Sequence, residues 1–188
     1  MIALKKLILV ALVLILGTLA CMINLGGPAY PTPSIPVSTE AVESLEQTIH
    51  QAIAAGADTG TLTLAITETQ LTSYLALKLQ LQSSPIITFP QVYLRDGQIR
   101  IYGTATQGYF QVTASIILTA GIDSAGQLQI ELSSADFGPM PVPQEVNDAL
   151  STVIKEAFTG SLGPVATGLR LDSVTIADGI MVIVGRTK

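Results

Sequence analysis

The chain has 188 residues, of which 48% are apolar and only 12% are charged. This length allows one domain of ordinary size with appendages. After residue 25 the chain carries seven basic and fourteen acidic residues, a net charge of −7. An acidic domain that is poor in aromatic residues is badly suited to a phosphate backbone, so we exclude nucleic acid as a partner.

The N-terminus has a short basic start followed by an almost purely apolar run over residues 7–23. A transmembrane anchor needs about 20 such residues, and roughly 17 are tolerated. A lipoprotein signal, with Cys21 as the candidate lipidation site, and a cleaved signal peptide are the two alternatives. The basic flank of Lys5 and Lys6 fixes the orientation. All three interpretations place the chain after residue 25 outside the cytoplasm, and the first predicts a single-pass protein of the cell membrane.

Residues 26–39 contain four prolines and predict a linker between the N-terminal segment, residues 1–25, and the rest of the chain. In the polyproline II conformation each residue spans about 3.1 Å, so the linker would hold a domain roughly 40 Å from the bilayer. Residues 40–188 are then the extracytoplasmic domain. Cys21 is the only cysteine, which excludes an internal disulfide and a cysteine-rich metal site.

The domain opens with an amphipathic pattern over residues 40–55 that predicts a docking helix, capped by Ser38 or Thr39. A turn over residues 56–60 and a strand over residues 61–66 follow. The sequence Thr67-Glu-Thr-Gln70 has the form of a capping box and predicts the start of a second helix. Its end is ambiguous, because the leucines up to residue 81 also fit the period of a strand.

From residue 88 the pattern is typical of an antiparallel meander. Asp96-Gly97 and Asp178-Gly179 are strong hairpin signals, and residues 109–122 predict a strand longer than about 40 Å. The segments Val92–Gly103 and Val174–Gly185 repeat one pattern at an offset of 82 residues. Chance similarity of two Asp-Gly hairpins and a duplicated helix-then-hairpin unit are both compatible with this repeat. The glycine that ends each segment predicts a bend or a bulge.

Residues 141–158 have the most pronounced helical periodicity of the chain, with Pro143 suited to the first turn and Gly160 to the C-cap. Eighteen residues give a helix of roughly 27 Å, shorter than the predicted sheet. The sheet therefore needs a further cover, either the helix that follows Thr67 or a bound lipid.

The sequence offers little to support catalysis. His50 is the only histidine and has no partners at zinc spacing. Asp96, Asp123 and Asp178 fall in predicted turns, where aspartate side chains bond to the local backbone. We therefore expect no enzyme activity, no catalytic residues, no metal and no cofactor.

Four stretches carry a resemblance to a known group: LAITETQLTSYL from Leu64, PQVYLRDGQIRIYG from Pro90, GPMPVP from Gly138, and the closing Val174–Gly185 hairpin. Together they resemble the YpmS-like and YceB-like bacterial envelope proteins, which are related to the TULIP (BPI-like) lipid-binding superfamily. The resemblance implies an α+β fold in which a long curved antiparallel sheet wraps around one or two amphipathic helices. It also implies an apolar groove for acyl chains, with no catalytic residues to carry over.

The sequence favours a non-enzymatic, membrane-tethered module that binds a lipid or another amphiphile between helix and sheet. The alternative is an envelope scaffold or protein-interaction module with a filled core. The candidate lining of the groove is Phe110, Val112, Ile116, Leu118, Leu128, Ile130, Leu150, Val153 and Ile154.

Overall fold

The computed structural model describes residue 6, residues 23–81, residue 85, residues 87–140 and residues 169–187. The predicted membrane segment up to residue 22, Cys21 and the predicted helix over residues 141–158 lie outside these ranges. The elements in chain order are β1 (Ile23–Asn24), α2 (Thr39–Thr59), β2 (Thr61–Thr67), α3 (Glu68–Gln80), β3 (Ile87–Arg95), β4 (Gln98–Gln107), β5 (Phe110–Ile122), β6 (Leu128–Asp136), β7 (Leu169–Ala177) and β8 (Ile180–Thr187).

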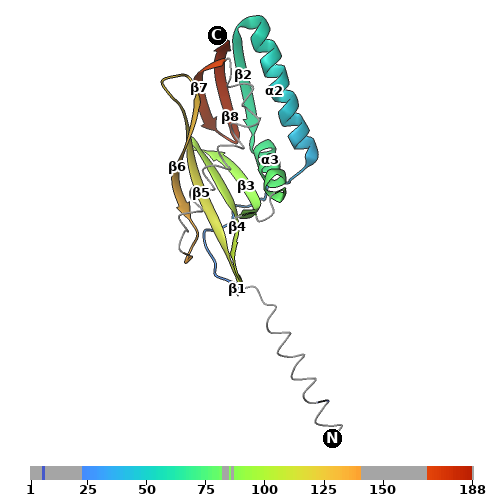
Figure 1. Cartoon of the computed structure of the whole chain (residues 1–188), viewed down its shortest axis with the longest axis vertical. Coiled ribbons are helices and arrows are strands. Elements are labelled where there is room, and N and C mark those ends of the chain that lie inside the picture. Colours follow the sequence, from blue (N-terminus) through green and yellow to red (C-terminus); the bar gives the residue numbers. More distant parts are fainter. Residues whose placement is uncertain (1–5, 7–22, 82–84, 86, 141–168, 188) are drawn as a thin grey trace.

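The strands form two hydrogen-bonded sheets. The larger contains β3, β4, β5 and β6 in antiparallel order, with β1 added parallel to the start of β5. The smaller has the order β2-β8-β7 and is antiparallel throughout. Figure 1 shows the two sheets one above the other, with α2 along β2 and α3 beside β3. The expected α+β fold with a curled antiparallel sheet and two helices is confirmed.

The two Asp-Gly hairpins meet at their turns. Gly97 N–H donates to the Ile176 carbonyl at 3.1 Å, and Gly179 N–H donates to the Leu94 carbonyl at 3.0 Å. The two donors are 82 residues apart, and so are the two acceptors. This is also the offset between the two sequence patterns. The repeat is therefore also structural, since equivalent atoms of the two hairpins join the larger sheet to the smaller one.

The glycine that ends each repeated segment lies opposite a bulge, as expected from the sequence. Gly103 faces the irregularity between Thr88 and Gln91 of β3, and a Cβ on it would lie 2.1 Å from the Ile87 side chain. Gly185 pairs with Leu171, where β7 is bulged. A larger residue at either position would displace the neighbouring strand.

Helix α2 begins at the predicted cap, where the Ser38 hydroxyl accepts a hydrogen bond from Ala41 N–H. The prediction of a turn over residues 56–60 is wrong for residues 56–59, because the helix continues to Thr59. Gly56 is buried in the helix against Leu62 of β2, and its missing side chain permits this close approach. Gly60, with φ of 74°, ends the helix as a left-handed cap.

Helix α3 opens with the predicted capping box between Thr67 and Gln70. The ambiguity over its end is resolved in favour of a helix up to Gln80. The hydroxyl of Thr72 is fully buried and accepts a hydrogen bond from Val92 N–H at 2.9 Å, which fastens the helix to β3. Because α3 also contacts α2, it is buried on most of its circumference.

Residues 23–37, which we call the strap, lie against the larger sheet (Figure 1). Ile23 N–H donates to the Tyr109 carbonyl at 2.9 Å, and Thr113 N–H donates to the Gly26 carbonyl at 2.9 Å. Gly27 makes this pairing possible, since it has φ of 124° and a Cβ on it would lie 2.2 Å from the Thr113 carbonyl oxygen.

Further along the strap, side chains of the sheet hold its backbone. The Gln91 side chain accepts from Ile35 N–H at 2.5 Å and donates to the Ile35 carbonyl at 3.0 Å. The Tyr93 hydroxyl donates to the Pro33 carbonyl at 3.2 Å. These residues therefore do not extend away from the domain as a 40 Å spacer would. The prolines favour an extended backbone in the strap, and side chains of the sheet donate hydrogen bonds to its carbonyl groups.

Within the described ranges, no helix is long and apolar enough to cross a membrane.

Candidate functional site

The apolar side chains of β3, β4, β5 and β6 share one face of the larger sheet, which we call the inner face. Residues directly opposite one another in a sheet point to the same side. One such row joins Leu94, Ile99, Leu118 and Leu132 across all four strands. Beyond this row, β5 and β6 continue as a two-stranded ribbon, with Ala120 opposite Ile130 and Ile122 opposite Leu128.

Burial of the inner face decreases from β3 towards β6. Leu94 and Ile99 are 0% exposed and Leu118 is 2% exposed. The inner residues of β6 (Leu128, Ile130, Leu132 and Ala135) are only partly buried, although they pack against the same core. The inner face is thus closed on the β3 side and incompletely covered by the described residues along β6.

The predicted lining residues fall into three groups. Val112, Ile116 and Leu118 are fully buried core residues. Leu128 and Ile130 lie on the partly buried part of the inner face. Phe110 is 44% exposed at the beginning of β5. Leu150, Val153 and Ile154, as well as the candidate lipidation site Cys21, are outside the described residues.

The opposite face of the sheet is polar and carries the strap. Tyr93 and Tyr102 pack edge to face with ring centroids 5.8 Å apart, and Tyr30 of the strap lies 6.4 Å from Tyr102. Burial raises the pKa of Tyr30 and of Tyr93 above the usual value, and the charge of Glu68 acts in the same direction on Tyr93. This face is therefore occupied by the chain itself.

Glu68 sits where the two sheets and α3 meet. Its carboxylate accepts from Leu94 N–H at 2.7 Å and forms an ion pair with Arg95, while its own N–H donates to the Gly179 carbonyl at 3.1 Å. The Glu68 side chain is only 15% exposed. Each contact goes to a structural element, so we assign Glu68 to holding the junction together.

A hollow of about 150 Å³ lies at the β5–β6 ribbon. It is lined by Thr119, Ala120, Gly121, Ile122, Gln129 and Glu131, a mixture of polar and apolar side chains. Its size and lining are not those of a long apolar groove, so it does not correspond to the predicted acyl-chain site.

The carboxylates that drew attention in the sequence bond to nearby groups. The Asp123 side chain accepts from Ala125 N–H at 2.9 Å and from Gln127 N–H at 2.8 Å, and Asp96 pairs with Arg100 at 2.7 Å. His50 is exposed on α2. In the described ranges no three side chains of histidine, cysteine, aspartate or glutamate are placed to hold a metal ion.

Two features of this region were missed by the sequence interpretation. The docked strap is the first, because a proline-rich stretch has the same composition whether it is free or bound. The exposed end of the sheet around Tyr109 and Phe110 is the second. The pattern placed Phe110 on the same face as Val112, but alternation alone does not tell where the cover of that face ends.

Comparison with known proteins provides one match. Residues 34–186 match the family of LmeA-like phospholipid-binding proteins. A search of curated proteins found no match. The matched range begins within the strap and includes both helices and every strand from β2 to β8, so it covers most of the chain. It confirms the resemblance to TULIP-like lipid-binding proteins and supports lipid binding. The chain belongs to the LmeA-like phospholipid-binding family.

Proposed function

We propose that this protein is a membrane-tethered, non-enzymatic module outside the cytoplasm that holds the acyl chains of a phospholipid against the inner face of its larger sheet. The observation that carries the proposal is the uneven cover of that face. Its β3 and β4 residues are fully buried, whereas the apolar residues of β6 are only partly buried. Apolar surface left open in this way gains from contact with hydrocarbon, at about 25 cal/mol per Å².

The other side of the acyl chain would be covered by the amphipathic helix expected over residues 141–158. Its candidate residues Leu150, Val153 and Ile154 have the helical spacing required to face the sheet. The groove would then run along β5 and β6, with Leu128 and Ile130 on its sheet side.

The absence of catalysis is part of the proposal. Asp96, Asp123 and Asp172 each bond to a nearby arginine or to turn backbone, and Glu68 is committed to the junction. Carboxylates held in this way stabilise the fold and are not free to act as a general acid or base. The extracytoplasmic location and the tether rest on the basic flank and the apolar run of residues 7–23.

The direct test is native mass spectrometry of the full chain after gentle extraction from membranes. We expect a mass increase that corresponds to phospholipid. A lipid-free mass under conditions that retain phospholipid on another lipid-binding protein would contradict the proposal and would favour the scaffold alternative.

A pair of substitutions locates the ligand. Ile130→Trp adds bulk on the inner face, and Gln129→Trp adds the same bulk on the exposed outer side of the same strand. We expect the first to lower the amount of bound lipid several-fold and the second to leave it unchanged. Equal lipid content in both variants would place the ligand elsewhere.

The tether is tested separately by cell fractionation. Cys21→Ser should leave the protein in the membrane fraction if residues 7–23 form an anchor, and should release it if lipidation at this cysteine provides the attachment. In either case, protease added outside intact spheroplasts should digest the domain.

A further inference from the structure

The end of the larger sheet at the β4–β5 turn exposes a group of apolar side chains, which we call the tip. It consists of Ile23, Tyr109 and Phe110, which are 51%, 70% and 44% exposed. Ile23 is directly paired with Phe110, and its N–H is bonded to the Tyr109 carbonyl. The three residues therefore lie together at one end of the sheet, and a group of exposed apolar residues of this kind marks an interaction surface.

The tip continues the inner face of the sheet. Phe110, Val112, Ala114, Ile116 and Leu118 alternate along β5, so all five project to the same side. Val112 is 1% exposed, whereas Phe110 lies beyond the last pair between β3 and β4, which is Ile87 with Ala105. The apolar column thus runs from the core to the outside of the molecule without a polar interruption.

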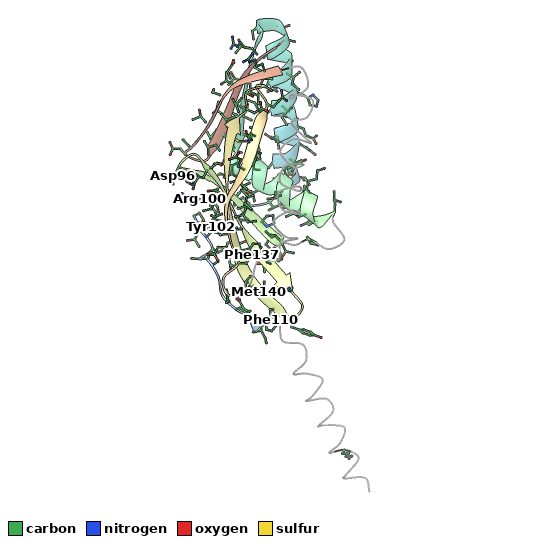
Figure 2. All side chains as sticks on the ribbon, turned by 60° about the vertical axis from the view of Figure 1, so that its left-hand side comes forward. Asp96, Arg100, Tyr102, Phe110, Phe137 and Met140 are labelled. Atoms are coloured by element: carbon green, nitrogen blue, oxygen red, sulfur yellow. The ribbon has the colours of Figure 1, made fainter. Side chains whose placement is uncertain are left out.

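The parts of β3, β4 and β5 that lie next to the tip carry no charged residue. The sequence has no lysine, arginine, aspartate or glutamate between Arg100 and Asp123, and none between Lys78 and Arg95. The charged pair of Asp96 and Arg100 lies at the other end of the same sheet (Figure 2). Counted from the tip, the first charged residue that pairs with β5 is Asp136, which lies opposite Ser115. The net charge after residue 25 is −7, and this separation lets the tip approach lipid headgroups without bringing the charged residues of the described strands with it.

The path of the chain brings this end close to the apolar run. Since the strap is bound along the sheet, the chain leaves the domain at Ile23, the last residue of the apolar run 7–23. No free linker therefore separates the described domain from the end of that run.

We infer that the tip formed by Ile23, Tyr109 and Phe110 contacts the bilayer. This contact would orient the domain so that the beginning of β5 faces the lipid. This inference rests on the tether in the proposed function. Tyrosine is suited to such a position, because its ring lies among acyl chains while its hydroxyl remains at the headgroups. Uncharged Thr104, Thr106 and Gln107 at the same end can enter the interface without the cost of desolvating a charge.

A bilayer explains these features better than a protein partner would. Among the described residues, β1, β5 and the turn between β4 and β5 contain no charged side chain that would guide a second protein. The tip also lies at Ile23, where the apolar run ends.

The experiment uses the fact that the chain contains no tryptophan. Tyr109→Trp introduces one indole at the tip, and Thr175→Trp introduces one at an exposed position on β7 as the matched control. The full chain is reconstituted into vesicles of phosphatidylethanolamine and phosphatidylglycerol, and quenching by bromine-labelled acyl chains is measured. We expect a blue-shifted, quenched indole at position 109 and an unquenched one at position 175.

A second pair of substitutions separates insertion from mere proximity to the tether. In the Tyr109→Trp background, Phe110→Asp puts a charge into the contact, while Ile180→Asp does so at a residue of similar exposure, 42%, beside the Asp178-Gly179 turn. We expect Phe110→Asp to lower the ratio of docked to free domain by about tenfold or more. It removes a phenyl group that docking would bury in the bilayer, and it adds a charge. Ile180→Asp should leave quenching unchanged.

Either of two results would overturn the inference. One is an unquenched indole at position 109 in vesicles. The other is quenching that persists in the Phe110→Asp variant while circular dichroism shows an intact fold. Bound phospholipid is measured by mass spectrometry on the same samples. In the Tyr109→Trp protein, an unquenched indole with lipid retained contradicts only this inference. A quenched indole in a protein without bound lipid contradicts only the proposed function.

Discussion

Glu68 is a single residue on which three elements depend. Its carboxylate bonds to Leu94 N–H and Arg95, and its backbone reaches Gly179 of the second hairpin. We expect Glu68→Ala to lower the free energy of unfolding by about 2–3 kcal/mol, because it leaves a buried strand N–H without a partner and removes a charge-assisted bond.

The matched control for Glu68 is the ion pair between Asp172 and Arg186, which is formed at 2.7 Å by exposed side chains. Asp172→Ala should change the urea unfolding midpoint much less, since exposed pairs gain little over hydration. Equal midpoints for the two variants would show that the junction does not depend on the Glu68 carboxylate.

Tyr30 and Tyr93 make the strap sensitive to alkaline pH. Burial raises the pKa of both above 10.0, so the neutral form is favoured in the folded state. A raised folded pKa gives stability that is fully present below the unfolded value and is lost as pH rises through the folded one. Once ionised, Tyr30 also cannot donate to the Phe89 carbonyl of β3, and Tyr93 cannot donate to the Pro33 carbonyl of the strap.

We therefore expect Tyr30 and Tyr93 to ionise at a higher pH than is usual for tyrosine in an absorbance titration, with the strap detaching as they do. Tyr30→Phe should remove one of the late ionisations. If Tyr30→Phe instead removed an ionisation at the ordinary pH of tyrosine, the result would contradict the partial burial of Tyr30 in the strap.

At the scale of elements, features that depend on local chemistry were predictable. The Asp-Gly turns, the Thr67 capping box and the long β5 strand follow from residues that are neighbours in sequence. The docked strap was not predictable, because its partners Gln91 and Tyr93 are distant in sequence. For the candidate site, periodicity placed Ile116 and Phe110 on one face, but their different exposure depends on how far the neighbouring strands extend.

The glycines opposite the two bulges allow a test by substitution. Gly103→Ala should destabilise the protein by about 2 kcal/mol or more, since the new Cβ would meet the Ile87 side chain at 2.1 Å. Gly121→Ala, in the neighbouring strand, meets nothing within 4 Å and should be neutral or slightly stabilising. Thermal unfolding of the two variants decides this, and equal midpoints would mean that β3 can move away from Gly103 at little cost.

At the scale of the whole molecule, the two sheets are joined at the hairpin turns and differ in their cover. The smaller sheet packs on α2, and α3 covers β3, which leaves β6 as the least buried of the four antiparallel strands of the larger sheet. If phospholipid occupies the inner face along β6, it should stabilise that strand selectively, because a ligand stabilises the state that it binds. The hairpin of β3 and β4, whose inner residues are already buried, should gain little.

Hydrogen–deuterium exchange of the full chain tests this difference between strands. Removal of bound lipid should speed exchange in β6 and in residues 119–122 of β5, while β3 and β4 exchange as before. Adding phosphatidylglycerol should restore slow exchange in β6. The Ile130→Trp variant, in which the indole occupies the lipid position, should show slow exchange with or without lipid. A uniform change across all strands would contradict a ligand on this face and would indicate that lipid acts on global stability alone.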